Sequence, residues 1–148
     1  MNRRESESPP AFRVAWPVEA LVSVAAEPRH RTAIIVVVNN AEEIRQRLLT
    51  TGLAVNLALN GVELFALVGR ESEEAHDALD CALEVAGAEG VVTSWHDPDD
   101  PEDVASFVLS SCRASGLNLV VAALDESTKS GARLRSSIDE ALRGCADE

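Results

Sequence analysis

The chain has 148 residues and a formal net charge of −12 at pH 7, with 25 acidic and 13 basic residues. This length suits one domain, and 46% hydrophobic with 26% charged residues is typical of a globular protein. The acidic balance argues against nucleic-acid binding, because contacts to phosphate need clustered lysine and arginine. It is compatible with docking onto a basic partner.

No charged-then-apolar signal segment opens the chain, and no apolar run approaches the roughly 18 residues of a membrane span. We therefore expect a cytoplasmic protein without membrane contact. The cysteines Cys81, Cys112 and Cys145 lack the paired spacing of a zinc site. Each falls on or beside the apolar face of a predicted helix, which predicts core positions for all of them.

Three parts follow one another along the chain. Residues 1–10 are polar and end in two prolines, which predicts a disordered tail. Residues 11–30 form an N-terminal extension, and an α/β domain is expected over residues 31–148.

The extension has a mixed pattern. Phe12, Val14 and Trp16 alternate as on a half-buried strand, and Pro17 ends that pattern. Residues 18–26 fit either a short helix or a further strand. The extension is expected to pack across the domain or to contact a partner.

From residue 32 strands and helices alternate. Asp100 is placed to cap the helix that follows the strand at 90–96, Pro101 takes its first position, and Gly116 ends it. The other patterns predict strands at 33–38 and 117–124 and helices at 41–51, 71–86 and 131–144.

The apolar stretch 53–68 is ambiguous. Asn60-Gly61 at its centre is a type I′ turn signal, which predicts a hairpin between strands 54–59 and 62–68. The alternative is one strand at 63–68 after irregular chain. In both cases the order predicts an α/β fold, with a single domain, a mostly parallel sheet and helices on its faces.

Common cofactor sites of α/β proteins are missing from the sequence. The turn after the first predicted strand of the domain, Asn39-Asn40, has no glycine, so the dinucleotide and P-loop cradles are absent. No Gly-x-Ser-x-Gly elbow is present. We therefore expect neither a cofactor nor a metal.

The best candidate site is Trp95-His96-Asp97, at the carboxyl end of a predicted strand, where open α/β sheets usually bind ligands. Trp95 and His96 point to opposite faces of the strand. Asp97 is placed to tune the charge of the His96 imidazole, and Asp99 lies in the following turn. The alternative is a packed tryptophan, a histidine bonded to the backbone and ordinary turn and cap chemistry.

Two further residues are predicted at the same edge of the sheet. His76 begins a helix after a neighbouring strand, and Asp125 follows the last strand. His76 and His96 with Asp97 or Asp99 would suit a metal or acid/base site. The alternatives are a structural histidine paired with Asp80 and, at Asp125, an acidic surface loop.

His76-Asp77 and Thr93-Ser94-Trp95-His96-Asp97, in their strand and helix context, resemble a family of small uncharacterised bacterial α/β proteins with a Thr-Thr-Trp-His-Asp motif. Ser94 replaces the second threonine, and Pro98 departs from a more acidic turn. The resemblance covers residues 32–110 and implies that both histidines belong to one pattern, without implying an activity.

These observations favour a non-catalytic domain that binds a protein, such as an acidic immunity or accessory protein with a basic partner. The expected binding residues are Trp95, His96, Asp97, Asp99 and Asp125. One alternative is an enzyme or metal-dependent hydrolase that uses His76, His96 and nearby carboxylates. Another is a homo-oligomeric scaffold, such as a homodimer that exchanges the N-terminal segment.

Overall fold

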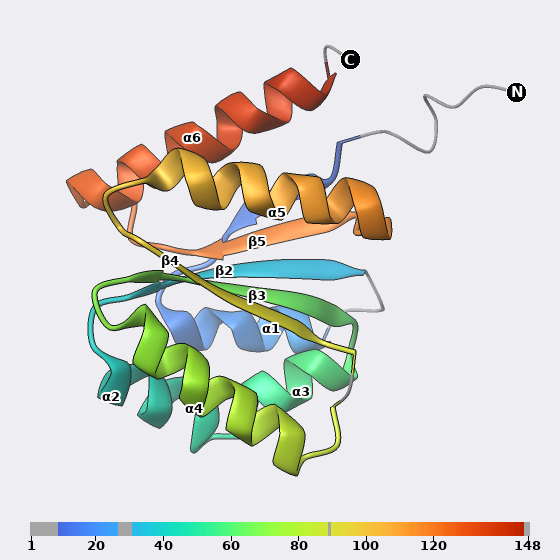
Figure 1. Cartoon of the computed structure of the whole chain (residues 1–148), viewed down its shortest axis with the longest axis vertical. Helices are drawn as coiled ribbons and strands as arrows, with labels where there is room; N and C mark the ends of the chain where they lie inside the picture. Colours follow the sequence, from blue (N-terminus) through green and yellow to red (C-terminus); the bar gives the residue numbers. More distant parts are fainter. Residues whose placement is uncertain (1–8, 27–30, 89, 147–148) are drawn as a thin grey trace, which may run out of the picture.

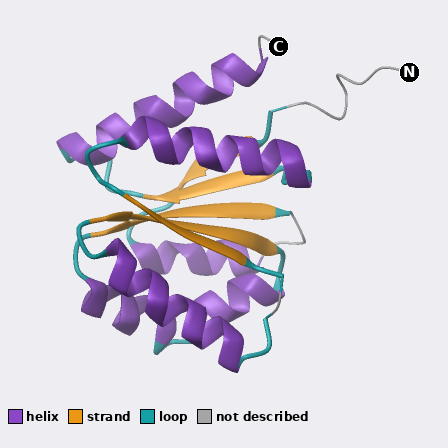
Figure 2. Cartoon of the chain, viewed as in Figure 1, coloured by secondary structure: helices purple, strands orange, loops and turns teal. Residues whose placement is uncertain are grey.

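Five parallel strands form one sheet in the order β1-β5-β2-β3-β4 (Figures 1 and 2). The computed structural model describes residues 9–26, 31–88 and 90–146. The strands are β1 (Ala11–Val14), β2 (Thr32–Val38), β3 (Val62–Gly69), β4 (Val92–His96) and β5 (Leu119–Ala123). The helical segments are η2 (Val18–Leu21), α1 (Val22–Ala26), α2 (Ala41–Ile44), η3 (Arg45–Leu49), α3 (Leu53–Leu59), α4 (Ser72–Val85), α5 (Pro101–Ser115) and α6 (Lys129–Ala146).

The helices form two layers, with α1 to α4 on one face of the sheet and α5 and α6 on the other (Figure 1). Alternate residues of β2 enter the two cores: Ile34 and Val36 face the first layer, and Ala33 and Ile35 face the second. A strand covered on both faces must be apolar throughout, which explains its continuous run of apolar residues.

The division into layers follows from the strand order. From β2 through β3 to β4 the chain moves in one direction, and right-handed crossovers place α2 to α4 on one face. The chain then returns across the sheet to β5, which places α5 and α6 on the other face. The adjacent strands β2 and β5 are therefore followed by helices on opposite faces, and such a topological switch point is where open α/β sheets bind ligands.

The α/β class and the parallel sheet are confirmed, but the hairpin at Asn60-Gly61 is wrong. Residues 53–59 form α3, and Val62 begins a strand parallel to β2. A type I′ turn needs positive φ at both central residues. Gly61 has a φ of 116°, whereas Asn60 has −108° and ends α3.

The N-terminal extension contributes an edge strand to this sheet, because β1 pairs with β5 from Ala11 to Val14. Residues 18–26 are helical, one of the two forms expected. The predicted tail at residues 1–10 lies mostly outside the described residues.

The core prediction for the cysteines holds for one of them. Cys112, on α5, is buried, but Cys81 is exposed. The reason is helical phase: α4 buries Leu79 and Leu83, and Cys81, midway between them, points to the opposite side. The side chain of Cys145 lies outside the described part of the chain.

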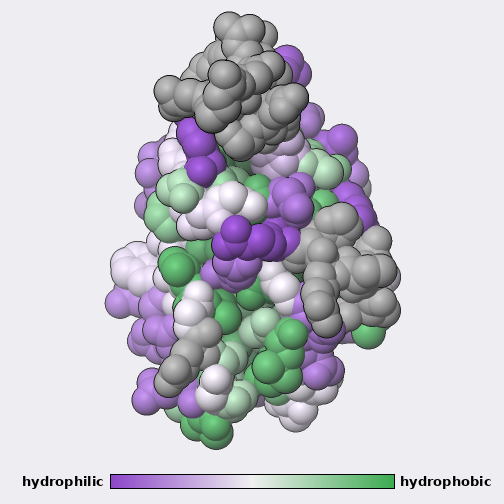
Figure 3. All heavy atoms as spheres, turned by 90° about the vertical axis from the view of Figure 1, so that its right-hand side faces the viewer, coloured by the Kyte–Doolittle hydropathy of each residue, from purple (hydrophilic) through white to green (hydrophobic). Residues whose placement is uncertain are grey.

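Figure 3 views the molecule from the amino ends of the strands. Hydrophobic side chains gather in its lower half, where α1, α3 and α4 lie. Exposed apolar residues of these helices are Val22, Leu59 and Val85. The polar loops described next lie at the other end of the strands.

Candidate functional site

The loops at the carboxyl ends of the strands are fixed by helix caps. Asp100 caps α5 as predicted, because its side chain accepts a hydrogen bond from the Asp103 N–H at 3.2 Å. Asn40 caps α2, and the Glu71 carboxylate accepts from the Ala41 N–H at 2.8 Å, which joins the loops after β2 and β3. The loops at the carboxyl edge of the sheet are therefore held together by hydrogen bonds and are not independent turns.

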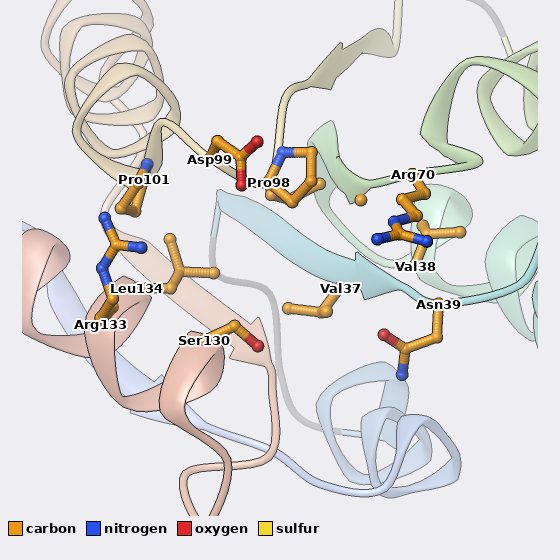
Figure 4. Close-up of a pocket in the computed structure, with 12 residues that line it drawn as sticks. Val37, Val38, Asn39, Arg70, Pro98, Asp99, Pro101, Ser130, Arg133 and Leu134 are labelled. Atoms are coloured by element: carbon orange, nitrogen blue, oxygen red, sulfur yellow. The ribbon is translucent and has the colours of Figure 1, made fainter.

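A pocket of about 320 Å³ opens at this edge, on the α5 and α6 side of β2 and β3 (Figure 4). Its apolar residues come from the ends of the two strands, from the loop after β4, from the start of α5 and from α6. Its polar residues come from the loops and from α6. The residues that line it are Val37, Val38, Asn39, Val68, Gly69, Arg70, Pro98, Asp99, Pro101, Ser130, Arg133 and Leu134. The pocket thus lies beside the switch point of the sheet.

Two arginines line this pocket without a protein partner. Arg70 follows β3, and Arg133 lies near the start of α6. Both side chains are exposed, and within the described residues neither makes a hydrogen bond or an ion pair. Sequence reasoning missed both, although each lies within a few residues of a strand's carboxyl end or a helix start at this edge.

A second hollow, of about 360 Å³, adjoins the first one. The two share Gly69, Arg70, Pro98 and Asp99. The second is also lined by Trp95, His96 and Asp97 from the predicted site and by Ser72 and Glu73 from α4. The structure therefore brings four of the five predicted binding residues together around one hollow.

Trp95 and His96 face different environments. The Trp95 side chain lies on the side of α4 and is 47% exposed, whereas His96 faces α5 and is 8% exposed. The prediction that they point to opposite faces is confirmed. The alternative of a packed Trp95 is wrong, because the residue stays largely exposed on the outermost strand of the described sheet.

Both ring nitrogens of His96 have side-chain partners. Nδ1 lies 3.1 Å from Asp103 Oδ2 and Nε2 lies 2.9 Å from Ser94 Oγ, while Phe107 packs on the ring at 5.2 Å between centroids. A carboxylate accepts only, so Nδ1–H donates to Asp103. Asp103, in the first turn of α5, therefore has the role that was predicted for Asp97.

The hydrogen bonds from Ser94 through His96 to Asp103 have the order found in hydrolytic Ser-His-Asp triads. In a neutral imidazole whose Nδ1 carries the proton, Nε2 accepts from the Ser94 hydroxyl. Neither hollow at this edge is lined by Ser94. The arrangement is thus well placed to tie β4 to α5.

His76 belongs to a different cluster, on the α4 face. Its Nε2 lies 3.0 Å from Thr93 Oγ1, and the Thr93 hydroxyl donates to Asp80 at 2.5 Å. Because that hydroxyl has one proton, Nε2–H of His76 donates to Thr93. Asp80 is the partner expected for a structural histidine: its Oδ2 lies 3.8 Å from His76 Nε2, and Thr93 bridges the two side chains.

The two histidines therefore do not form a shared site. His76 contacts Thr93 on one face of β4, and His96 contacts Ser94 on the other. Successive strand residues point to opposite faces, so the sheet separates the two imidazoles. Within the described ranges, no group of three or more histidine, cysteine or acidic side chains is placed to hold a metal.

The remaining predicted residues have local roles. Asp97 accepts a hydrogen bond from the Asp99 N–H at 2.8 Å, which shapes the turn before α5, and Asp99 lines both hollows. Asp125 accepts from the Ser127 hydroxyl at 2.6 Å and from its N–H at 3.0 Å. These bonds hold the pKa of Asp125 below its ordinary value, and Asp125 lines neither hollow.

No helix among the described residues has the length and apolar character needed to cross a membrane. Comparisons with curated proteins and with solved structures gave no match. The profile of one protein family matches residues 13–142, most of the chain, which confirms the expected resemblance to a family without an assigned activity. The chain belongs to the family described as domain of unknown function DUF7684.

Proposed function

We propose that this domain is a non-catalytic protein-binding module, and that edge strand β4 pairs with an extended basic segment of a partner. The observation that carries the proposal is the open side of β4. Among the described strands β4 pairs with β3 alone, so its other side presents unpaired backbone groups. Partners bind such edges by adding a strand to the sheet.

The exposed side chains of β4 are of the kind found at protein interfaces. Natural edge strands are usually protected by lysine, proline or a bulge. This edge instead presents Trp95, 47% exposed, and Val92, 54% exposed. Tryptophan is enriched among the residues that dominate binding energy at protein interfaces.

The surroundings of β4 are acidic, which favours a basic partner. Exposed carboxylates flank the strand from α4 and from the loop that follows it, namely Glu73, Asp77, Asp80, Asp97 and Asp99. The whole chain carries −12. Such a field speeds the encounter with a cationic segment and disfavours nucleic acid.

The proposal is tested with a short peptide that alternates arginine and valine. Calorimetry measures peptide binding by the wild type and every variant. In a Trp16→Phe background Trp95 is the only tryptophan, so its fluorescence shows in addition whether the bound peptide reaches Trp95. Trp95→Lys is expected to weaken binding roughly tenfold or more, because it removes the anchor and repels the peptide. Val85→Lys, at an exposed site on α4, makes the same charge change and should leave binding within about twofold.

Two results contradict the proposal. One is binding that Trp95→Lys and Val85→Lys weaken equally, which indicates a charge effect alone. The other is a dimer of the free protein that dissociates in Trp95→Lys, which shows that a second copy occupies the edge and supports the homo-oligomer alternative.

A second candidate function is hydrolysis by Ser94, favoured by the order of the Ser94-His96-Asp103 hydrogen bonds. A fluorophosphonate labels a serine activated in this way. Labelling of the wild type that is lost in Ser94→Ala and His96→Gln supports catalysis. Absence of labelling contradicts this second candidate.

A further inference from the structure

We infer that the pocket at the carboxyl ends of β2 and β3 binds a small organic dianion, held at its two ends by Arg70 and Arg133. This inference does not rest on the proposed protein-binding function, although Arg70 also lines the adjoining hollow beside Trp95. It lies beside the topological switch between β2 and β5. That crevice is where the ligands of open α/β sheets bind.

The size of the pocket limits the ligand. Small-molecule sites span about 300–1,000 Å³, and this one, at about 320 Å³, lies at the lower limit. Its walls are built from buried strand ends and one helix, including Val68 and Leu134. A compact metabolite fits such a volume, whereas a dinucleotide does not.

The charge of the pocket is unusual for this chain. Acidic residues outnumber basic ones by 25 to 13, yet Arg70 and Arg133 have no carboxylate partner among the residues that the structure describes. By contrast, Arg31, Arg45 and Arg47 pair with glutamates. The other described cations without a protein partner, Lys129 and Arg143, do not line the pocket. A guanidinium left unpaired beside a pocket is suited to bidentate contact with carboxylate or phosphate.

The arrangement of the side chains indicates the form of the ligand. Figure 4 shows Arg70 and Arg133 on opposite sides of the pocket, with Val37 and Leu134 between them. A ligand that reaches both arginines therefore carries an anionic group at each end and an apolar or neutral centre. Asp99 on the same rim disfavours a ligand with further negative charge.

The inference is tested by calorimetry with linear α,ω-dicarboxylates of increasing length, with monocarboxylates of matched length and with inorganic phosphate. Dicarboxylates of one length range should bind, and matched monocarboxylates should bind roughly tenfold to hundredfold more weakly, because one charged contact is lost. Arg70→Gln and Arg133→Gln should each weaken dicarboxylate binding by a similar factor. Arg143→Gln, a matched change on α6 outside the pocket, should leave it unchanged.

Three outcomes overturn the inference. The first is no binding by any dicarboxylate, and the second is equal binding of dicarboxylates and monocarboxylates. The third is equal weakening by Arg143→Gln and the two pocket variants, which indicates non-specific charge attraction. Because the arginines are exposed, the variants are expected to fold, and unchanged circular dichroism verifies this. Peptide binding at β4 should persist in Arg133→Gln and Arg143→Gln, which change no residue of the hollow beside Trp95, so failure here leaves the protein-binding proposal standing.

Discussion

His96 at the end of β4 donates a hydrogen bond to Asp103 in the first turn of α5, with Nδ1 and Oδ2 3.1 Å apart. The bond closes the loop that contains Asp97 and Asp99. It joins β4, an edge strand with only one neighbour in the described sheet, to helix α5. The open side of β4 is thus held on a rigid support.

Asp103→Asn is expected to lower the free energy of unfolding by about 1 kcal/mol, because it removes the charge of the carboxylate that accepts the hydrogen bond from the buried His96 imidazole. The Asp103 carboxylate is exposed to water, which keeps the effect small. Urea denaturation measures the effect. Glu102→Gln removes a charge from the same helix turn and is the matched control for the helix dipole. Equal losses in the two variants would show that the dipole, and not His96, accounts for the effect.

Asp80→Asn is expected to destabilise the fold more than Asp77→Asn, by about 1 kcal/mol. Asp80 accepts the 2.5 Å hydrogen bond from Thr93 that orders the His76 cluster. Asp77 approaches His76 only at 3.4 Å. Thermal unfolding of both variants checks this order, and the reverse order would refute the hydrogen-bond assignment.

Gly69→Ala is expected to destabilise the protein by more than about 3 kcal/mol. Gly69 has a φ of 151°, and an added Cβ would lie 1.8 Å from the Val38 carbonyl oxygen. Gly87→Ala is the control, because Gly87 also has a positive φ of 72° but open space around the added atom. Its cost should be about 1 kcal/mol from backbone strain alone. Similar unfolding midpoints for Gly69→Ala and Gly87→Ala would contradict this prediction, because they would show that β2 and β3 separate readily at Gly69.

The contribution of Glu63 to stability is expected to depend on pH. Hydrogen bonds from Arg31 hold its pKa below the ordinary 4.5, although partial burial acts the other way. Ionised Glu63 therefore adds stability above pH 4.5, and this contribution is lost as the pH falls through the lower pKa of the folded state. Urea unfolding should show Glu63→Gln less stable than the wild type at pH 7, with the difference shrinking at acidic pH. The exposed Glu140→Gln is the control, and a difference for Glu63→Gln that grows in acid would contradict the sign.

Local pattern was enough to predict most elements of the fold. The apolar runs of β2 and β5 and the Asp100 cap of α5 are encoded by neighbouring residues. The Asn60-Gly61 signal failed because the two residues also suit a helix end, and the choice depends on packing of α3 against the sheet.

The site was harder to predict because it depends on strand order. Strand alternation alone places Thr93 and Ser94 on opposite faces of β4. Which helix covers each face depends on the return of the chain from β4 to β5, which no local pattern reports. For the same reason the sequence predicts His76 and His96 together, and it does not predict that Arg70 and Arg133 line opposite sides of one pocket.

Amide hydrogen exchange of the domain with and without the arginine-valine peptide tests the central claim most directly. Strand addition pairs the outward N–H groups of β4, so exchange within residues 92–96 should slow strongly on peptide binding. The amides of β1, at the other edge of the sheet, should be unaffected. Slowed exchange at β1 or on the helices, with β4 unchanged, would contradict the account.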